Sequence, residues 1–292
     1  MLIFVTGSNG FIGKNMVEYL RLKYEILSPK RNELDLLDEG AVRNFLGRHK
    51  IELVIHSAVT PGHRNAKDPS NQLFKNTRMF FNLVRNSNRF ERMIFLSSGA
   101  VYDMRYYVPK MREESFDTHV PIDEHGFSKY ICAKYIEQAD NIVELRLFGI
   151  FGKYEDYEIR FISNAICKTL FDLPITIKQN RRFDYLYIDD LMPVIDYFIE
   201  NKGRFKSYNV TPDTSIELVE LSERIRVISG KDLPIIVAQD GIGIEYSGDN
   251  QRLREEISKL AFTPISEALQ QLYSWCAKNR HMLNKEFLLL DK

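Results

Sequence analysis

Short apolar runs alternate with longer amphipathic stretches through the first half of the chain. Brief apolar runs bounded by polar or glycine residues are typical of buried strands, whereas apolar residues spaced three and four apart are typical of helices. The pattern predicts strands at Leu2–Val5, Tyr24–Leu27, Leu53–His56, Met93–Leu96 and Val143–Leu147, with helices near 12–22, 39–48, 70–88 and 126–140. Because strands that alternate with helices form parallel sheets, we expect an α/β fold with a doubly wound parallel sheet.

The pattern is less regular beyond about residue 150. It predicts helices near 158–171, 189–201, 215–229 and 264–279 and short strands at 175–178, 207–210 and 234–237. No internal repeat or low-complexity linker separates the two halves, so we expect one folded unit. We assign residues 1–150 to the main domain, with 180–205 returning to it, and residues 151–292 mainly to a smaller, interleaved lobe.

A glycine-rich loop connects the first strand to the first helix. Its sequence is TGSNGFIG, from Thr6 to Gly13. In a dinucleotide-binding fingerprint, Gly7 permits the tight turn, Gly10 lets the backbone approach a pyrophosphate, and Gly13 lets the helix pack closely on the strand. The free N–H groups at the helix start favour an anion. The expected cofactor contacts in this loop are Gly7, Ser8, Asn9, Gly10, Phe11, Ile12 and Gly13.

The second strand ends in Ser28-Pro29-Lys30-Arg31. A site that prefers NAD usually carries a carboxylate here, which accepts a hydrogen bond from the ribose 2′-hydroxyl. A guanidinium instead matches the oxygens of a 2′-phosphate. Arg31, with Lys30, therefore favours NADP(H) over NAD(H), which stays possible; the alternative is a basic turn that is simply solvated.

Composition narrows the classes of partner. Forty Lys and Arg balance forty Asp and Glu, so no overall field attracts nucleic acid or an anionic membrane. The three cysteines have no paired spacing and the histidines no ligand spacing, so we expect reduced thiols, no metal and a cytoplasmic protein. The apolar N-terminus runs directly into the glycine loop, which is typical of a first strand and not of a signal peptide or membrane span.

The order of motifs along the chain resembles the extended short-chain dehydrogenase/reductase family, and within it the nucleotide-sugar reductases and epimerases. Besides TGSNGFIG, the matching segments are RNELDLLD at 31–38, HSA at 56–58, SSGAVY at 97–102, LRLFGIFG at 145–152, YLYIDDL at 185–191, and FTP at 262–264 with Trp275. The resemblance implies a Rossmann domain that binds NAD(P) and a C-terminal lobe that binds a nucleoside-diphosphate sugar. Relatives commonly form homodimers.

The same resemblance implies roles for individual residues. Asp35 and Leu36 would flank the adenine, Ala58 would lie in the segment that passes over the cofactor, and Asn76 matches a structural or cofactor-loop asparagine. Ser98, four residues before Tyr102, would contact the substrate carbonyl.

The family's catalytic Tyr-x-x-x-Lys motif is altered. His125-Gly126-Phe127-Ser128-Lys129 matches its Tyr-Gly-x-Ser-Lys frame with histidine in place of tyrosine, whereas Tyr130 and Lys134 match only the spacing. A shift of five residues rotates a helical side chain by about 140°, so only one register can face the cofactor. The interval to Arg146 favours Ser98, His125 and Lys129 as the catalytic set, with Tyr130 and Lys134 as the alternative. Histidine can still exchange a proton near neutral pH.

Two further departures bear on the reaction. Relatives that epimerise carbons beside the keto group carry a cysteine and a histidine base, where this chain has Ala100 and Arg160. Alanine cannot remove a proton, so epimerisation by that route is disfavoured. Arg160 and Arg182 are candidates to clamp a substrate diphosphate, although each could equally be a solvated charge. Asp189-Asp190 at a helix start favours capping over catalysis.

These observations favour a cytoplasmic NADP(H)-dependent reductase of a nucleoside-diphosphate 4-keto-6-deoxysugar. A nucleotide-sugar 4-epimerase with tightly bound NAD(P) is the nearest alternative, because it uses the same fold without net redox change. A catalytically silent nucleotide-binding protein is the third, because the tyrosine of the motif is replaced at His125.

Overall fold

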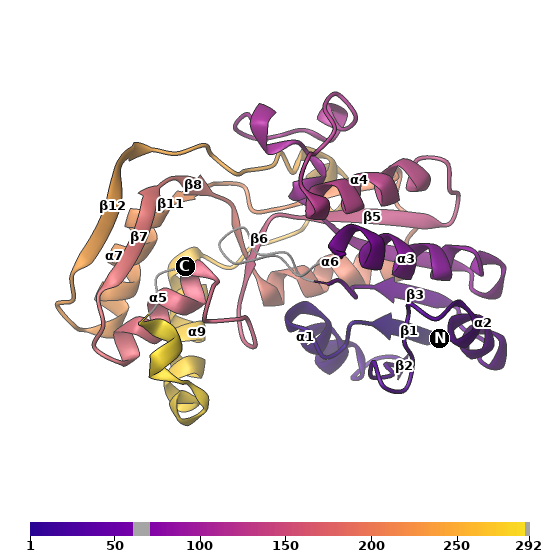
Figure 1. Cartoon of the computed structure of the whole chain (residues 1–292), viewed down its shortest axis with the longest axis horizontal. Coiled ribbons are helices and arrows are strands. Elements are labelled where there is room, and N and C mark those ends of the chain that lie inside the picture. The colour runs from indigo at the N-terminus through magenta and orange to yellow at the C-terminus, as the bar shows by residue number, and fades with distance from the viewer. Residues whose placement is uncertain (61–70, 290–292) are drawn as a thin grey trace.

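The computed structural model describes residues 1–60 and 71–289 as two lobes that share one chain (Figure 1). The larger lobe contains a six-stranded, fully parallel sheet in the order β10-β5-β4-β3-β1-β2. Its strands are β1 (Leu2–Thr6), β2 (Glu25–Leu27), β3 (Leu53–His56), β4 (Arg92–Ser98), β5 (Ile142–Leu147) and β10 (Ser207–Val210). The expected doubly wound α/β fold is confirmed, because every crossover joins parallel strands.

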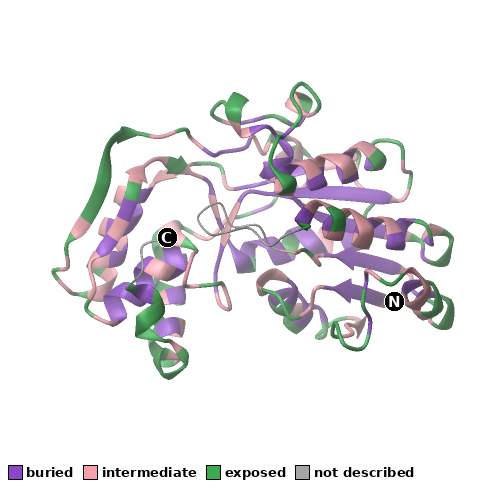
Figure 2. Ribbon diagram, viewed as in Figure 1, coloured by how far each residue is buried: buried purple, intermediate pink, exposed green. Residues whose placement is uncertain are grey.

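Helices cover both faces of this sheet. They are α1 (Phe11–Leu20), α2 (Glu39–Arg48), α3 (Gln72–Val84), α4 (Glu124–Ile136) and α6 (Ile188–Glu200). Successive residues of a strand point to opposite faces. Accordingly Ile3 and Val5 pack in the same core cluster as α1 and α6, whereas Phe4 packs with α2, α3 and α4. Apart from the edge strand β2, the strands are therefore buried on both sides, as Figure 2 shows in purple, and this explains their continuous apolar runs.

The smaller lobe lies beside the carboxyl ends of the strands (Figure 1). It contains α5 (Phe161–Leu170), α7 (Leu218–Ser229) and α9 (Ile265–Lys278), with β7 (Ile175–Asn180) parallel to β12 (Ile235–Ile242). The short helix α8 (Gln251–Glu256) instead packs against β10 of the larger lobe. Three shorter strands connect it to the larger lobe or brace it, β8 (Arg182–Phe183), β9 (Tyr185–Tyr187) and β11 (Ile216–Glu217), and β9 pairs with β6 (Gly149–Phe151). No described helix is long and apolar enough to cross a membrane.

The structure differs from the sequence prediction mainly after residue 150. The strand expected at 207–210 belongs to the main sheet beside β5, so the segment that returns to that sheet extends past residue 205. The two- and three-residue strands β6, β8, β9 and β11 were not predicted, because such short segments have no measurable period. The helix expected near 70–88 runs only from Gln72 to Val84, with residue 70 outside the described part.

Candidate functional site

The loop between β1 and α1 has the geometry of a phosphate cradle. Gly7 has φ +72°, a conformation that favours glycine, and its carbonyl accepts a hydrogen bond of 3.0 Å from Gly10 N–H. A Cβ on Gly13 would lie 2.1 Å from the Gly7 carbonyl oxygen, whereas a Cβ on Gly10 would stay at 3.4 Å. The start of α1 has no side-chain cap and no acidic residue in its first turn. The residues present therefore fit a bound pyrophosphate, whose charge the helix N–H groups would stabilise.

The ends of β1 and β3 form the wall beside this cradle. Thr6 Oγ1 lies 2.8 Å from His56 Nδ1 and accepts a hydrogen bond of 3.2 Å from Ala58 N–H, and Ser57 Oγ donates to the Thr6 carbonyl at 2.7 Å. Burial lowers the pKa of His56 to about 3, with the charge of Lys129 acting in the same direction. His56 is therefore a neutral structural histidine, and Ala58 lies against Gly7 beside the cradle.

Asn76 on α3 holds the segment that follows β3. Its side chain is buried, and its Oδ1 accepts a hydrogen bond of 2.7 Å from Thr60 N–H while its Nδ2 donates to the Thr60 carbonyl at 3.3 Å. Asn76 therefore fixes the backbone of the segment after β3 at Thr60.

The other expected adenine-side residues lie on the loop after β2. Arg31 and Asp35 are exposed, whereas Leu36 is buried and its carbonyl accepts a hydrogen bond of 2.8 Å from Asn82. Asp35 Oδ1 accepts from Leu37 N–H at 3.0 Å, so this carboxylate stabilises its own turn. Arg21, the C-cap of α1, also lies near this loop, as its hydrogen bond to Ser28 shows. The sequence motifs did not identify it, because it lies outside both TGSNGFIG and RNELDLLD.

The end of β4 and the first turns of α4 meet at the expected catalytic residues. Ser98 is half-buried, and its Oγ accepts a hydrogen bond of 3.1 Å from Ala100 N–H, which leaves the hydroxyl hydrogen for another acceptor. A Cβ on Gly126 would lie 2.6 Å from the Ala100 carbonyl oxygen, so α4 packs directly on the turn that follows Ser98. His125 and Lys129 are four residues apart and thus share one face of α4.

Lys129 is buried between α4 and the sheet. Its Nζ donates to the Leu96 carbonyl at 3.1 Å and lies 4.7 Å from the centre of the Phe95 ring. Burial lowers the pKa of this ammonium, while Glu144 and Cys132 act in the opposite direction. Leu96 is two residues before Ser98 on β4, so the structure places Lys129 and Ser98 at the same end of the same strand.

The alternative register faces elsewhere. The Tyr130 hydroxyl donates to Asp117, whose other carboxylate oxygen lies 3.0 Å from Lys134 Nζ. The Tyr130 ring packs 5.4 Å from Phe116. Tyr130 and Lys134 thus bind the loop before α4, on a different side of the helix from the Lys129 contact with β4.

Aromatic rings cover the turn beside Ser98. A Cβ on Gly99 would lie 2.7 Å from the Tyr246 hydroxyl and 2.8 Å from the Phe148 ring, and Tyr107 donates its hydroxyl hydrogen to the Gly99 carbonyl at 2.8 Å. Phe148 and Tyr246 pack 5.2 Å apart. Three buried aromatic side chains therefore enclose the turn at Gly99 on this side.

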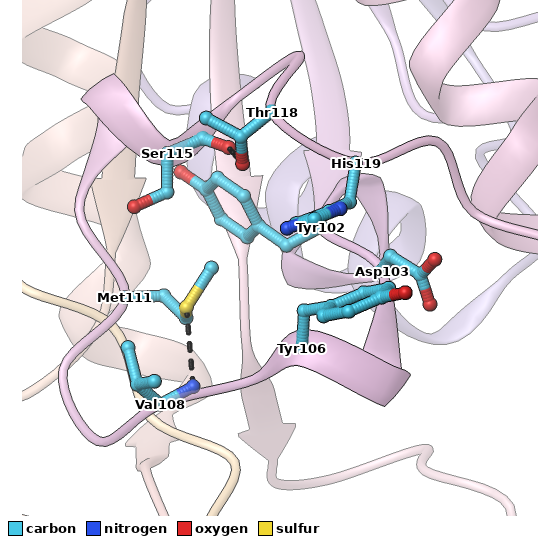
Figure 3. Close-up of a pocket in the computed structure, with 8 residues that line it drawn as sticks. All are labelled: Tyr102, Asp103, Tyr106, Val108, Met111, Ser115, Thr118 and His119. Atoms are coloured by element: carbon cyan, nitrogen blue, oxygen red, sulfur yellow. Dashed lines mark hydrogen bonds between the residues drawn. The ribbon is translucent and has the colours of Figure 1, made fainter.

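A separate cavity of about 140 Å³ opens in the segment that follows Tyr102 (Figure 3). The His119 and Tyr106 rings stack at its edge, 3.6 Å apart and nearly parallel. Its lining consists of Tyr102, Asp103, Tyr106, Val108, Met111, Ser115, Thr118 and His119. None of the predicted site residues belongs to this lining, so we do not assign the cavity to the chemistry at Ser98.

The two arginines predicted to clamp the substrate lie in different settings. Arg160 is exposed at the N-cap of α5, whereas Arg182 on β8 forms an ion pair of 3.0 Å with Glu217 on β11. Arg181, not Arg182, shares with Arg160 the neighbourhood of Tyr185, where both oppose the rise of the phenol pKa that burial causes. A diphosphate clamp formed by Arg160 and Arg182 stays a prediction.

Glu155 is a titratable group that the sequence analysis did not single out. Its carboxylate lies 2.5 Å from the Ser163 hydroxyl in the first turn of α5, and burial raises its pKa to about 8, with Ser163 and Arg160 acting in the opposite direction. The only available signal was its position shortly after the LRLFGIFG segment.

The Asp189-Asp190 pair was expected to cap a helix. Both residues lie in the first turn of α6, which has no side-chain cap. Asp190 instead accepts hydrogen bonds from Thr263 N–H at 2.9 Å and Thr263 Oγ1 at 2.6 Å. The carboxylate thus connects the larger lobe to the segment before α9, and the expected cap is wrong for Asp190.

Comparison with known proteins agrees with this geometry. The model of the NAD dependent epimerase/dehydratase family matches residues 3–211. GDP-L-colitose synthase of Yersinia pseudotuberculosis is 26% identical over 69% of this chain and 73% of its own length. dTDP-4-dehydro-6-deoxyglucose reductase of Escherichia coli is 25% identical over 90% of this chain and 92% of its own. The structure of Thermotoga maritima UDP-glucose 4-epimerase with UDP-glucose covers 97% of this chain and 100% of its own with a TM-score of 0.83, at 20% identity.

Proposed function

Since the chain belongs to the NAD dependent epimerase/dehydratase family, we propose that it is an NADP(H)-dependent reductase of a nucleoside-diphosphate 4-keto-6-deoxysugar. The observation that supports the proposal is the packing of α4 on the end of β4: Gly126 lies against the Ala100 carbonyl in the turn after Ser98, and Lys129, on the same helical face as His125, binds the Leu96 carbonyl. Two of the relatives, GDP-L-colitose synthase and dTDP-4-dehydro-6-deoxyglucose reductase, have names that imply sugar nucleotides as substrates.

Each of the three residues has a defined task. The hydroxyl hydrogen of Ser98 donates to the carbonyl oxygen of the sugar, which holds the carbonyl in place and stabilises the negative charge that develops there. His125 delivers a proton to that oxygen. The Lys129 ammonium donates one N–H to the Leu96 carbonyl, and its other N–H groups bind the nicotinamide ribose. The bound cofactor, when reduced, supplies the hydride.

Ala100 separates this proposal from an epimerase that works through proton removal. It stands in the turn beside Ser98, with its N–H bound to the Ser98 hydroxyl and its carbonyl under Gly126. Its methyl group cannot accept a proton. Ser98, His125 and Lys129 instead support hydride transfer to a single carbonyl carbon.

The test is the absorbance of NADPH, and separately of NADH, when the purified protein meets a panel of nucleoside-diphosphate 4-keto-6-deoxysugars. A reductase consumes NADPH in a one-to-one ratio with product, and Ser98→Ala should abolish most of that consumption. Conversion of a nucleotide sugar without net loss of cofactor would establish the 4-epimerase instead. Tight cofactor binding with no conversion at all would establish the catalytically silent protein.

A further inference from the structure

A second cation lies at the end of β2, beyond the basic turn recognised in the sequence. Arg21 is exposed, and its Nη2 donates to Ser28 Oγ at 3.0 Å. Ser28 is the first residue after β2, and its carbonyl accepts a hydrogen bond of 3.4 Å from Ser8 Oγ in the phosphate loop. Ser28 thus joins the phosphate loop to the Arg21 guanidinium.

The charges around Ser28 favour an anion. Lys30 and Arg31 follow it on the same loop, and both are exposed. The acidic group nearest in this loop is Glu33, whose carboxylate accepts a hydrogen bond of 2.6 Å from Lys30 N–H and so is committed to the turn. Glu25 lies at the opposite end of β2. One guanidinium therefore binds the neutral Ser28 hydroxyl, and two further cationic residues follow in the same loop, at the point where an NAD site places a carboxylate.

We propose that Arg21, held in place by Ser28, binds the 2′-phosphate of NADP(H) and is the main determinant of cofactor choice. A guanidinium carries five N–H donors, so its bond to one hydroxyl leaves several for phosphate oxygens. Ser28 can donate its own hydrogen to the same phosphate. The inference rests on the NADP(H) preference in the proposed function, but it does not depend on which sugar is reduced.

Arg21 also has a simpler structural role, since a cation at a helix C-terminus is stabilised by the helix dipole. Arg85 provides a matched control, because it is the C-cap of α3 and pairs with Glu39 at 3.1 Å, away from the phosphate loop. A structural role predicts similar effects of Arg21→Met and Arg85→Met on stability and none on cofactor choice.

The experiment measures binding by calorimetry of NADPH, NADH, 2′,5′-ADP and 5′-AMP to the intact chain. Arg21→Met should weaken NADPH and 2′,5′-ADP by about ten- to a hundredfold, the range expected for a charged hydrogen bond, and leave NADH and 5′-AMP unchanged. Arg85→Met should change none of the four. Ser28→Asp, which places a carboxylate beside Arg21, should weaken the binding of 2′,5′-ADP relative to wild type and strengthen the binding of NADH.

Equal loss of NADPH and NADH binding in Arg21→Met, or an unchanged affinity for 2′,5′-ADP, would overturn the inference. So would a wild-type protein that binds NADH as well as NADPH. Because 2′,5′-ADP binding needs no turnover, a protein that selects this fragment through Arg21 yet reduces no sugar would overturn the proposed function alone. Thermal unfolding of each variant establishes that it is folded before binding is compared.

Discussion

Replacing Gly13 by alanine tests whether the phosphate loop requires the close approach of α1 to β1. The added methyl group would lie 2.1 Å from the carbonyl oxygen and 2.7 Å from the carbonyl carbon of Gly7. Both are backbone atoms of a turn held at φ +72°, so they cannot rotate away as a flexible side chain would. The helix or the turn must therefore move by about 1 Å to restore ordinary contact.

Two opposing energies set the size of the effect. Alanine in a helix interior is favoured over glycine by about 1 kcal/mol, which would stabilise α1. Overpacking in a closely packed region costs about 1–3 kcal/mol, and a clash with rigid backbone lies at the upper end. We therefore expect Gly13→Ala to lower the free energy of unfolding by about 1–2 kcal/mol and to weaken cofactor binding at least about tenfold, because the cradle is displaced.

Gly10→Ala is the matched control, since its Cβ would stay at an ordinary 3.4 Å from the same Gly7 oxygen. It should leave the free energy of unfolding within about 1 kcal/mol of wild type, as expected at an N-cap, yet weaken NADPH binding where the backbone approaches the pyrophosphate. Urea unfolding and calorimetric NADPH titration measure the two quantities. A Gly13→Ala protein with wild-type stability and affinity would refute the reasoning, and so would a Gly10→Ala protein that binds NADPH normally.

Three further outcomes follow from the site and its surroundings. His125→Ala should lower turnover at least about a hundredfold, whereas Tyr130→Phe should keep it near wild type; the reverse ranking in steady-state assays would transfer the chemistry to the other register. Arg146→Met should cost about 3–5 kcal/mol in urea unfolding, because it leaves the buried Glu144 without the guanidinium 2.9 Å away; a loss below about 1 kcal/mol would contradict this account. Burial raises the pKa of the Glu155 carboxyl from 4.5 to about 8, so the folded state favours its neutral form. The free energy of unfolding should therefore fall as the pH rises from about 4.5 towards 8. Glu155→Gln should remove the contribution of this carboxyl, which thermal unfolding at several pH values measures; the same pH profile in wild type and variant would contradict a raised pKa of Glu155.

The parts of the site that depend on local spacing were predictable from the sequence. The glycines of the loop lie within seven residues, and their roles as turn and helix contact appear directly in the φ of Gly7 and the tight packing of Gly13. The separation of the two α4 registers follows from helix geometry. In the structure Lys129 binds the Leu96 carbonyl on β4, whereas Lys134 binds the Asp117 carboxylate.

Contacts between distant segments were not predictable, because no local pattern records them. The Asp190 carboxylate could have capped its own helix, but Thr263 supplies both a backbone and a hydroxyl donor from 73 residues away. The environment of Glu155 depends on burial beside α5, and an isolated glutamate in a loop carries no sign of that burial. Arg182 was a candidate to bind the substrate diphosphate, but nothing in the sequence indicated its ion pair with Glu217 on β11.

The position of β10 has a consequence for synthesis and truncation. β5 ends at Leu147, yet the strand that covers its outer edge begins only at Ser207, after the chain has passed through α5 and β7 of the smaller lobe and through α6. A nascent or truncated chain that stops near residue 150 would leave the backbone donors and acceptors of a wholly buried strand open to pairing with other molecules. The two lobes thus mature together, and a fragment cut at their apparent boundary should aggregate and not fold as a small cofactor-binding domain.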